Sequence, residues 1–314
     1  MKTICVVVPC YNEEDSVELL YERIDTVVKG NLSEYDYHII YVDDYSKDNT
    51  RNKIRELCAK DPGHVRAAFN SANFGFSRNV FSSLQLADGD INFMLFGDLQ
   101  DPPEILPKLV AEYEKTGKSV IIGQKTGSAE SKRMSFMRKM YYGMIDLFSD
   151  KHQIKNFNGF GLYDSNFIQT IRQVEDLQPY LKQIVAEYCP DYGVVGYQQS
   201  VSNRGKSNFN FYRNYDFAME GITSSTKKLM RLSTLIGTIL GAFSGIYAIS
   251  VVIKKLIYWD SYPFGMAALT VGVFFIGAVQ LFFIGILGEY LLSVNTKTLR
   301  RPRTVIGEKI NFGE

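Results

Sequence analysis

The sequence predicts an α/β domain with a parallel sheet, followed by a two-helix transmembrane hairpin. Two observations support this fold class. Short apolar runs alternate with amphipathic segments over roughly the first 230 residues, which is typical of β-α-β units. Beyond Arg231, two long runs carry no charged side chain. A chain of 314 residues has room for both units.

Within the first part, buried strands are expected wherever a short run is almost entirely apolar. These runs are 3–8, 37–42, 65–70, 91–96 and 119–124. The intervening segments carry helical periodicity or helix-start signals. They run from about 14 to 28 and from 46 to 60, and start again after Asn73 and at Pro102–Glu104. This order predicts parallel strands with helices on both faces, and ligands bound beyond the carboxyl ends of the strands.

The two uncharged runs are each long enough to cross a bilayer. Leu232–Ile253 contains 22 residues, which as a helix would extend about 33 Å, against a hydrocarbon core of about 30 Å. The second run, Ser261–Gly288, is also long enough to cross the bilayer if the helix is tilted. The spans are expected at about 232–253 and 264–290. A pair of buried core helices is the rival interpretation, and the lengths of the runs disfavour it.

Positive charge near the spans predicts their orientation. Seven Lys and Arg side chains flank the hairpin outside the connecting loop, at positions 227, 228, 231, 297, 300, 301 and 303. The loop itself carries only Lys254 and Lys255. We therefore expect an integral membrane protein whose large domain faces the cytoplasm at the inner membrane. The predicted parts are a catalytic domain at 1–210, a juxtamembrane amphipathic segment at 211–231, the hairpin at 232–292 and a cytoplasmic basic tail at 293–314.

Overall charge and the spacing of metal-ligand residues exclude two classes of protein. Thirty-five Lys and Arg against 34 Asp and Glu leave a net charge of +1, so no basic field for nucleic acid is expected. The four cysteines show no CxxC spacing and the three histidines do not cluster along the chain. This pattern favours neither a zinc site nor a disulfide framework.

Polar clusters follow three of the predicted strands, within 9–13, 43–46 and 98–104. Neither a GxGxxG nor a GxxxxGK[ST] pattern is present, so a nucleotide diphosphate would need another source of neutralising charge. Asp98 and Gln100 are two residues apart at a strand end, and their oxygens suit Mg²⁺ or Mn²⁺. An alternative reading makes Asp101 a helix cap, and Asp43 or Asp44 could cap the helix expected near residue 46.

Together these segments resemble family 2 glycosyltransferases, specifically the polyprenyl-phosphate branch. The resemblance rests on VVVPCYNEE, VDDYSKDNT, GDLQDPPE, a GKS segment at 205–207, and two apolar runs followed by GEY and RRP, in that order over nearly the whole chain. It implies a Rossmann-like GT-A catalytic domain that transfers a sugar from a nucleotide donor to a lipid phosphate.

The resemblance also implies roles for the residues at the strand ends. Nucleotide contacts would come from Pro9, Tyr11, Glu13, and Asp43 or Asp44. Asp98 and Gln100 would bind the metal on the diphosphate. The sequence departs from the family pattern at two positions: Phe96 replaces the first acidic residue of an Asp-x-Asp motif, and Tyr45 stands where glycine is usual.

Basic residues downstream are the candidates for holding phosphate, because the reaction must gather two anions. Lys125, Arg133 and Arg138 are expected near the lipid phosphate or diphosphate, and Ser207 with them. Arg204 and Lys206, beside Ser207, join Asp98 as candidate catalytic residues because the family places this segment by the phosphates. The helix expected at 131–148 could lie on the membrane surface, or could be an ordinary helix with solvated basic residues.

The predicted function is therefore inverting transfer of a sugar from a nucleotide donor, with UDP favoured, to a polyprenyl phosphate such as undecaprenyl phosphate, for assembly of cell-envelope glycans. Two rivals remain open: a polysaccharide acceptor, or a membrane scaffold that only binds nucleotide. Glycines at 237, 241 and 245 would permit close helix packing, within the hairpin or in a homo-oligomer.

Overall fold

A computed structural model describes residues 1–126, 154, 157–177, 179–198 and 302–313, together with scattered helical positions between 239 and 294. The chain divides into two compact units. One contains residues 1–136, 152–208 and 299–314, and the other contains 137–151 and 209–298. The strands described below all belong to the first unit.

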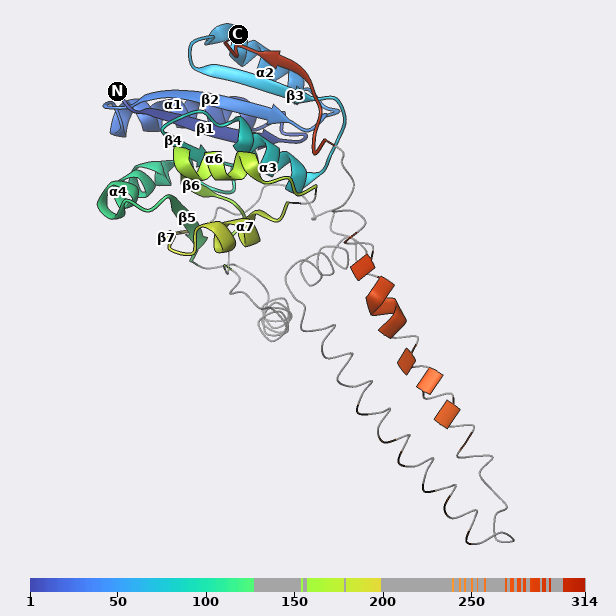
Figure 1. Ribbon diagram of the computed structural model, residues 1–314. Helices are drawn as coiled ribbons and strands as arrows, with labels where there is room; N and C mark the ends of the chain where they lie inside the picture. Colours follow the sequence, from blue (N-terminus) through green and yellow to red (C-terminus); the bar gives the residue numbers. More distant parts are fainter. Residues whose placement is uncertain are drawn as a thin grey trace. The chain divides into compact units, whose positions relative to one another are not determined.

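An eight-stranded sheet forms the centre of the first unit, in the order β7-β5-β6-β4-β1-β2-β3-β8 (Figure 1). Its strands are β1 (Thr3–Cys10), β2 (Asp36–Asp43), β3 (Val65–Asn70), β4 (Ile91–Met94), β5 (Val120–Lys125), β6 (Gly161–Asp164), β7 (Gly193–Tyr197) and β8 (Ile306–Ile310). In β1, Ile4 to Cys10 are all buried, as expected for a central strand covered on both faces.

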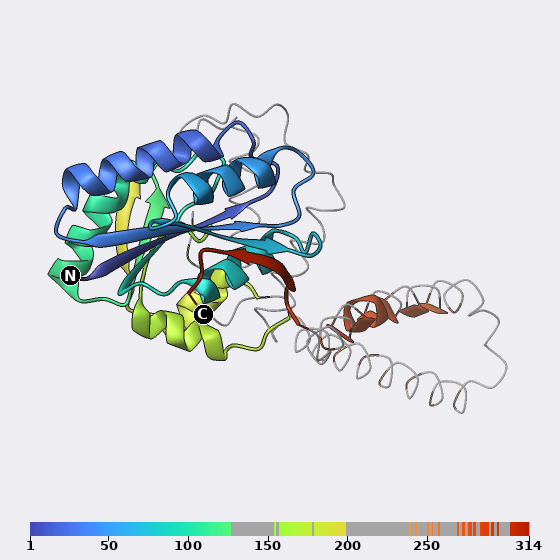
Figure 2. The same ribbon diagram turned by 90° about the horizontal axis from the view of Figure 1, so that it is seen from above.

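Helices cover both faces of this sheet (Figure 2). Those described are α1 (Val17–Asn31), α2 (Thr50–Lys60), α3 (Phe76–Leu86), α4 (Leu106–Thr116), α6 (Ser165–Gln173) and α7 (Leu181–Tyr188), with a short 3₁₀ turn, η1 (Pro103–Ile105). Helix α1 contacts α2 and α4 on one face, whereas α3 contacts α6 on the other. Buried residues of α1 recur every three or four positions, which is how an amphipathic helix packs onto a sheet.

The prediction of a wholly parallel sheet is correct for β1 to β5 and for β7, which is parallel to β5, and wrong for β6 and β8. β6 is antiparallel to both β4 and β5, and β8 is antiparallel to β3. Close packing at Gly161 accompanies the insertion of β6, because a β-carbon there would lie 2.5 Å from the carbonyl oxygen of Ile121. The sheet is therefore mixed.

β8 brings the end of the chain back to the first unit, in a segment for which the sequence predicted only a basic tail. Asn311 donates its side-chain N–H groups to the carbonyl oxygens of Cys58 (2.9 Å) and Val65 (2.8 Å). Just before β8, Arg303 donates to Gln85 Oε1 (2.8 Å), and its guanidinium lies 4.7 Å from the centre of the Phe81 ring. These contacts fasten the C-terminal segment to the sheet and to α3.

Among the positions that the structure describes, no helix combines the length and the apolar character needed to traverse a bilayer. Most of the predicted spans at 232–253 and 264–290, and all of the juxtamembrane segment 211–231, lie outside the described residues.

Candidate active site

The parallel strands β1, β2, β4 and β5 end at one edge of the sheet. Predicted site residues that the structure places at this edge are Pro9, Tyr11, Glu13, Asp43, Asp44, Asp98, Gln100 and Lys125. Arg133, Arg138, Arg204, Lys206 and Ser207 lie outside the described residues. The edge therefore collects candidate ligands for base, metal and phosphate.

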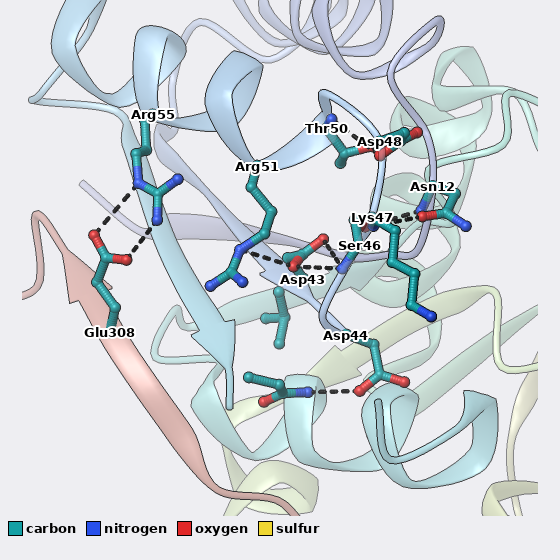
Figure 3. A network of polar contacts seen from close by, with 12 residues as sticks. Asn12, Asp43, Asp44, Ser46, Lys47, Asp48, Thr50, Arg51, Arg55 and Glu308 are labelled. Carbon is teal, nitrogen blue, oxygen red and sulfur yellow. Dashed lines mark hydrogen bonds and ion pairs between the residues drawn. The ribbon is translucent and has the colours of Figure 1, made fainter. Parts of the chain in front are cut away.

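The loops that follow β1 and β2 are bound to each other (Figure 3). Backbone N–H groups of Asn12 and Glu13 donate to Ser46 Oγ (2.9 Å) and Thr50 Oγ1 (2.7 Å). The N–H of Lys47 donates in return to Asn12 Oδ1 (2.9 Å). Because each loop supplies partners for the other, the first two strand ends form one rigid surface.

The exit of β4 packs directly on this surface. A β-carbon on Gly97 would lie 3.2 Å from Glu13 Cγ, so the two loops approach closely enough that any larger residue would have to displace the Glu13 side chain. Glu13 itself is buried and accepts a hydrogen bond from Ser16 Oγ (3.3 Å). The β4 exit, which carries Asp98 and Gln100, is thus held against the proposed nucleotide loops.

Asp43 is fully buried beside Arg51. Its carboxylate accepts the N–H of Ser46 (3.1 Å to Oδ2) and lies 3.5 Å from Arg51 Nε (Figure 3). Burial raises the pKa of Asp43, and the partial compensation comes from Ser46 and Arg51. Neither Asp43 nor Asp44 caps α2, because that helix begins only at Thr50, after Asn49.

Asp44 points toward a different part of the chain (Figure 3). Its carboxylate accepts three hydrogen bonds, from Asn70 Nδ2 (2.9 Å), Phe74 N (3.0 Å) and Gly75 N (2.9 Å). These donors precede α3, so Asp44 fastens the β3–α3 loop to the end of β2. This anchoring role requires tertiary contacts that the sequence alone does not reveal.

Tyr11 and Tyr45 are both exposed at the same edge, at 41% and 42%. Tyr45 occupies the left-handed backbone region (φ 63°), which glycine, the residue expected there from the family pattern, adopts without strain. Its ring is 5.4 Å from the Arg51 guanidinium, which also lies 5.1 Å from the Phe69 ring. Compared with glycine, Tyr45 adds an exposed aromatic surface and places a side chain on a strained backbone conformation.

Asp98 and Gln100 have the oxygen chemistry that a magnesium or manganese site needs. Both are half-buried, and Asp98 Oδ1 accepts the Gln100 N–H (3.1 Å) across Leu99, which has a left-handed backbone (φ 57°). One carboxylate and one amide oxygen, completed by water and diphosphate oxygens, fit either ion. When bound, such a metal would neutralise charge on a leaving diphosphate.

Asp101, three residues further on, links the β4 exit to two other segments. Its buried carboxylate accepts Tyr197 Oη (2.5 Å) and Asn158 Nδ2 (3.1 Å). The cap interpretation is wrong, because Pro102 occupies the position before η1 and no side chain caps that turn. Burial and the nearby carboxylates raise the pKa of Tyr197, which keeps it a hydrogen-bond donor.

Phe96 places apolar surface where the family pattern has a carboxylate. It is 7% exposed, and its ring stacks on that of Phe76, with 5.5 Å between centroids. A β-carbon on Gly159 would lie 3.6 Å from Phe96 Cζ. The first position of the motif therefore packs against neighbouring segments and adds no charge to the metal site.

One basic residue at this edge was missed by sequence reasoning. Lys182 lies in the first turn of α7, and burial together with the charge of Lys125 lowers its pKa to about 8. Nothing in the local sequence distinguishes it from a solvated helix lysine, because its surroundings come from β5 and from the packing of α7.

A second cluster of potential metal ligands lies toward the opposite ends of the strands. Ligand atoms of Cys5, His38 and Asp88 are within 4.8 Å of one another, although their sequence spacing predicted no zinc site. Asp88 already pairs with His38 Nε2 (2.5 Å) and Arg66 (2.7 Å), and burial raises the pKa of the Cys5 thiol to about 12. The guanidinium of Arg66 disfavours an additional cation here.

The class of this protein follows from the α/β fold and a family comparison. Residues 5–176 match Glycosyl transferase family 2, and the chain belongs to this family. It is thus a glycosyltransferase with a GT-A-like domain. The prediction made from the motifs is confirmed.

Relatives match over almost the whole chain. The prophage bactoprenol glucosyl transferase homolog of Escherichia coli K12 is 27% identical, over 96% of this chain and 98% of its own. The undecaprenyl-phosphate 4-deoxy-4-formamido-L-arabinose transferase of Proteus mirabilis HI4320 is 26% identical, over 96% and 92%. Among solved structures, glucosyl-3-phosphoglycerate synthase from Mycobacterium tuberculosis, in complex with Mn²⁺, UDP-glucose and phosphoglyceric acid, aligns with a TM-score of 0.49 at 18% identity. That alignment covers 71% of this chain and 78% of the synthase.

Proposed function

We propose that this glycosyltransferase moves a sugar from a nucleotide-sugar donor, with UDP as the favoured nucleotide, onto a polyprenyl phosphate such as undecaprenyl phosphate. The observation that carries the proposal is the single sheet edge that collects Asp43, the Asp98–Gln100 pair and Lys125. Relatives named for bactoprenol and undecaprenyl phosphate, matched along nearly their full lengths, support the choice of acceptor.

The chemistry needs little help from a strong base. A phosphate monoester has a second pKa near 6, so at neutral pH it is mostly a dianion and already nucleophilic. Attack by this oxygen on the anomeric carbon, with departure of the nucleotide diphosphate from the opposite side, inverts the configuration in one step. Asp98 and Gln100 would hold Mg²⁺ or Mn²⁺ on the diphosphate, and lysines would offset the remaining charge.

We also propose that the apolar runs at 232–253 and 264–290 form a membrane hairpin, which would give the enzyme access to a lipid acceptor. Described helical positions between 239 and 294 expose large apolar side chains, each 43–70% exposed. These are Ile239, Phe243, Ile246, Ile253, Ile257, Leu269, Val273, Ile276, Ile284, Leu287, Leu291 and Val294. Such surface is costly in water and is typical of contact with lipid or with other protein.

The pairing of β8 with β3 adds a topological argument. Because residues 299–314 belong to the same unit as residues 1–136, any bilayer crossings made by 209–298 must be even in number. Two crossings satisfy this condition. With the positive charges beside the predicted spans, we place the catalytic domain on the cytoplasmic face.

The test is transfer of radiolabel from a panel of UDP- and GDP-sugars into the organic phase. The reaction would contain purified full-length protein in detergent, undecaprenyl phosphate and Mg²⁺ or Mn²⁺. We expect label in the lipid with at least one UDP-sugar. Transfer only to an added polysaccharide would contradict the proposed acceptor.

Asp98→Asn tests the metal assignment in the same assay. Asn keeps an oxygen for the Gln100 N–H and removes the charge, so turnover is expected to fall about 100-fold or more. Glu104→Gln is the matched control, because Glu104 lies in the same motif but pairs with Arg23 at the surface (2.6 Å). Unchanged turnover in Asp98→Asn would refute the assignment.

A further inference from the structure

Two lysines lie at the sheet edge where β1, β2, β4 and β5 end, here called the catalytic edge. Lys125 ends β5, and Lys182 lies in the first turn of α7. Within the part of the chain that the structure describes, neither ammonium makes a hydrogen bond or an ion pair, although each is only partly exposed. Burial, and to a smaller extent the charge of Lys125, lower the pKa of Lys182 to about 8.

The position of this pair relative to the metal motif is set by β7. Lys125 lies opposite Tyr197 in the parallel β5–β7 register, and Tyr197 Oη donates to Asp101 (2.5 Å). The charge of Asp98 also contributes to the raised pKa of Tyr197. Tyr197 therefore connects Lys125 to the strand exit that carries the proposed metal ligands.

The packing of α7 brings Lys182 to the same place. Leu181, its neighbour, lies against Gly159, where a β-carbon would meet Leu181 Cδ2 at 3.1 Å. Gly159 in turn adjoins Phe96, two residues before Asp98. The first turn of α7 is thus fixed beside the β4 exit.

A partly buried ammonium group such as that of Lys182, with a second ammonium at the same edge, is stabilised when an anion binds beside it. A phosphate group suits this position, because it is anionic at neutral pH and its several oxygens can accept hydrogen bonds from both lysines. We propose that Lys182 acts with Lys125 as a binding residue for a phosphate group of a substrate. This inference deepens the proposed function and rests on it for the identity of the substrate.

Either the phosphate of the lipid acceptor or the diphosphate of the donor could supply this group, and binding measurements separate the two. Calorimetry on full-length protein in detergent would use UDP and undecaprenyl phosphate as separate probes, with wild type, Lys182→Met and Lys182→Arg. Methionine is unbranched like lysine, is one heavy atom shorter and carries no charge. Lys115→Met is the control, because Lys115 is 75% exposed at the end of α4.

We expect Lys182→Met to raise the dissociation constant of one probe by about 10-fold to 100-fold, the usual effect of losing one hydrogen bond to a charged group. A selective loss for undecaprenyl phosphate identifies the acceptor phosphate, and a selective loss for UDP identifies the diphosphate. Lys182→Arg should retain most of the affinity, and Lys115→Met should match wild type. Dissociation constants within two-fold of wild type for both probes would overturn the proposal.

Inorganic pyrophosphate, as a third probe, separates this inference from the proposed function. Weaker pyrophosphate binding by Lys182→Met, in a protein that transfers no label to lipid, would support the phosphate site while contradicting the proposed acceptor. Normal lipid glycosylation by Lys182→Met, with unchanged KM for both substrates, would contradict the phosphate site alone.

Discussion

Replacing Asp44 tests whether the end of β2 anchors a loop or binds the donor. The carboxylate is 2% exposed and accepts hydrogen bonds from Asn70, Phe74 and Gly75. Asp44→Ala would leave all three donors without this acceptor. The β3–α3 loop would then lose its link to β2.

The size of the effect follows from these three bonds. Each hydrogen bond to a charged group contributes about 1.5–3 kcal/mol, but the terms are not additive because the freed loop can turn toward water. We therefore expect Asp44→Ala to lower the free energy of unfolding by about 3–5 kcal/mol, as when one partner of a buried charge is removed. For a domain of this size, the melting temperature should fall by roughly 6–20 °C.

Thermal unfolding of the ligand-free protein in detergent, followed by intrinsic fluorescence, measures this change. Asp15→Ala is the control, since Asp15 is an exposed carboxylate on the neighbouring loop. Titration with UDP gives the second readout. A variant that melts within 2 °C of wild type but binds UDP tenfold more weakly would refute the anchoring role and assign Asp44 to the nucleotide.

Two further substitutions test the strain and the charge at the site. Tyr45→Gly should leave the free energy of unfolding within about 1 kcal/mol of wild type, because relief of the left-handed strain offsets loss of the ring contact with Arg51. Tyr45→Val keeps the strain and should lower the free energy of unfolding by about 1–2 kcal/mol. Equal melting temperatures for the two variants would contradict this reasoning. Lys182→Met should stabilise the protein at pH 7 by at most about 3.5 kcal/mol, since the pKa of Lys182 falls from 10.5 unfolded to about 8 folded and each pKa unit corresponds to about 1.4 kcal/mol. Below pH 8 the lysine is charged in both the folded and the unfolded state, so the folded wild type bears the full cost of the buried charge. The difference in unfolding free energy between Lys182→Met and wild type should therefore shrink between pH 8 and 10.5. A difference that does not change with pH would be evidence against the lowered pKa.

The local pattern was sufficient for β1 to β5 and the helices between them. In β1 the apolar run is uninterrupted because both faces are covered, and in α1 the buried positions repeat with helical period. These features depend on residues close in the sequence. They also placed the candidate ligands at the carboxyl ends of the strands before any tertiary contact was considered.

The strands that the sequence did not predict depend on distant partners. β8 is five residues of mixed character, and its position is determined by pairing with β3 and by the contacts of Arg303 and Asn311. β6 is four residues long, and the lack of a side chain at Gly161 lets it fit between β4 and β5. Neither short run carries the alternation that would identify a strand and its direction.

The same distinction separates the roles of the acidic residues. Asp43 ends a strand and Asp44, Asp98 and Asp101 follow strands. The sequence left a ligand or a helix cap open for Asp43, Asp44 and Asp101, and predicted a metal ligand at Asp98. The structure shows that Asp44 accepts hydrogen bonds that hold the β3–α3 loop, and that Asp101 accepts hydrogen bonds from Tyr197 and Asn158. These assignments come from donors 26 to 96 residues away in the chain.

Charge balance at the catalytic edge connects Phe96 with the two lysines. A carboxylate at position 96 would strengthen a metal site but would also repel an incoming phosphate, whereas Phe96 instead packs against Phe76. With fewer carboxylates there, a metal has a weaker hold, and a larger share of the phosphate charge must be offset by protein cations. Lys125 and Lys182 are placed to supply them. Under the proposal for Lys182, the departure from the family motif and the two lysines belong to one arrangement, in which some of the neutralisation would move from a metal ion to ammonium groups.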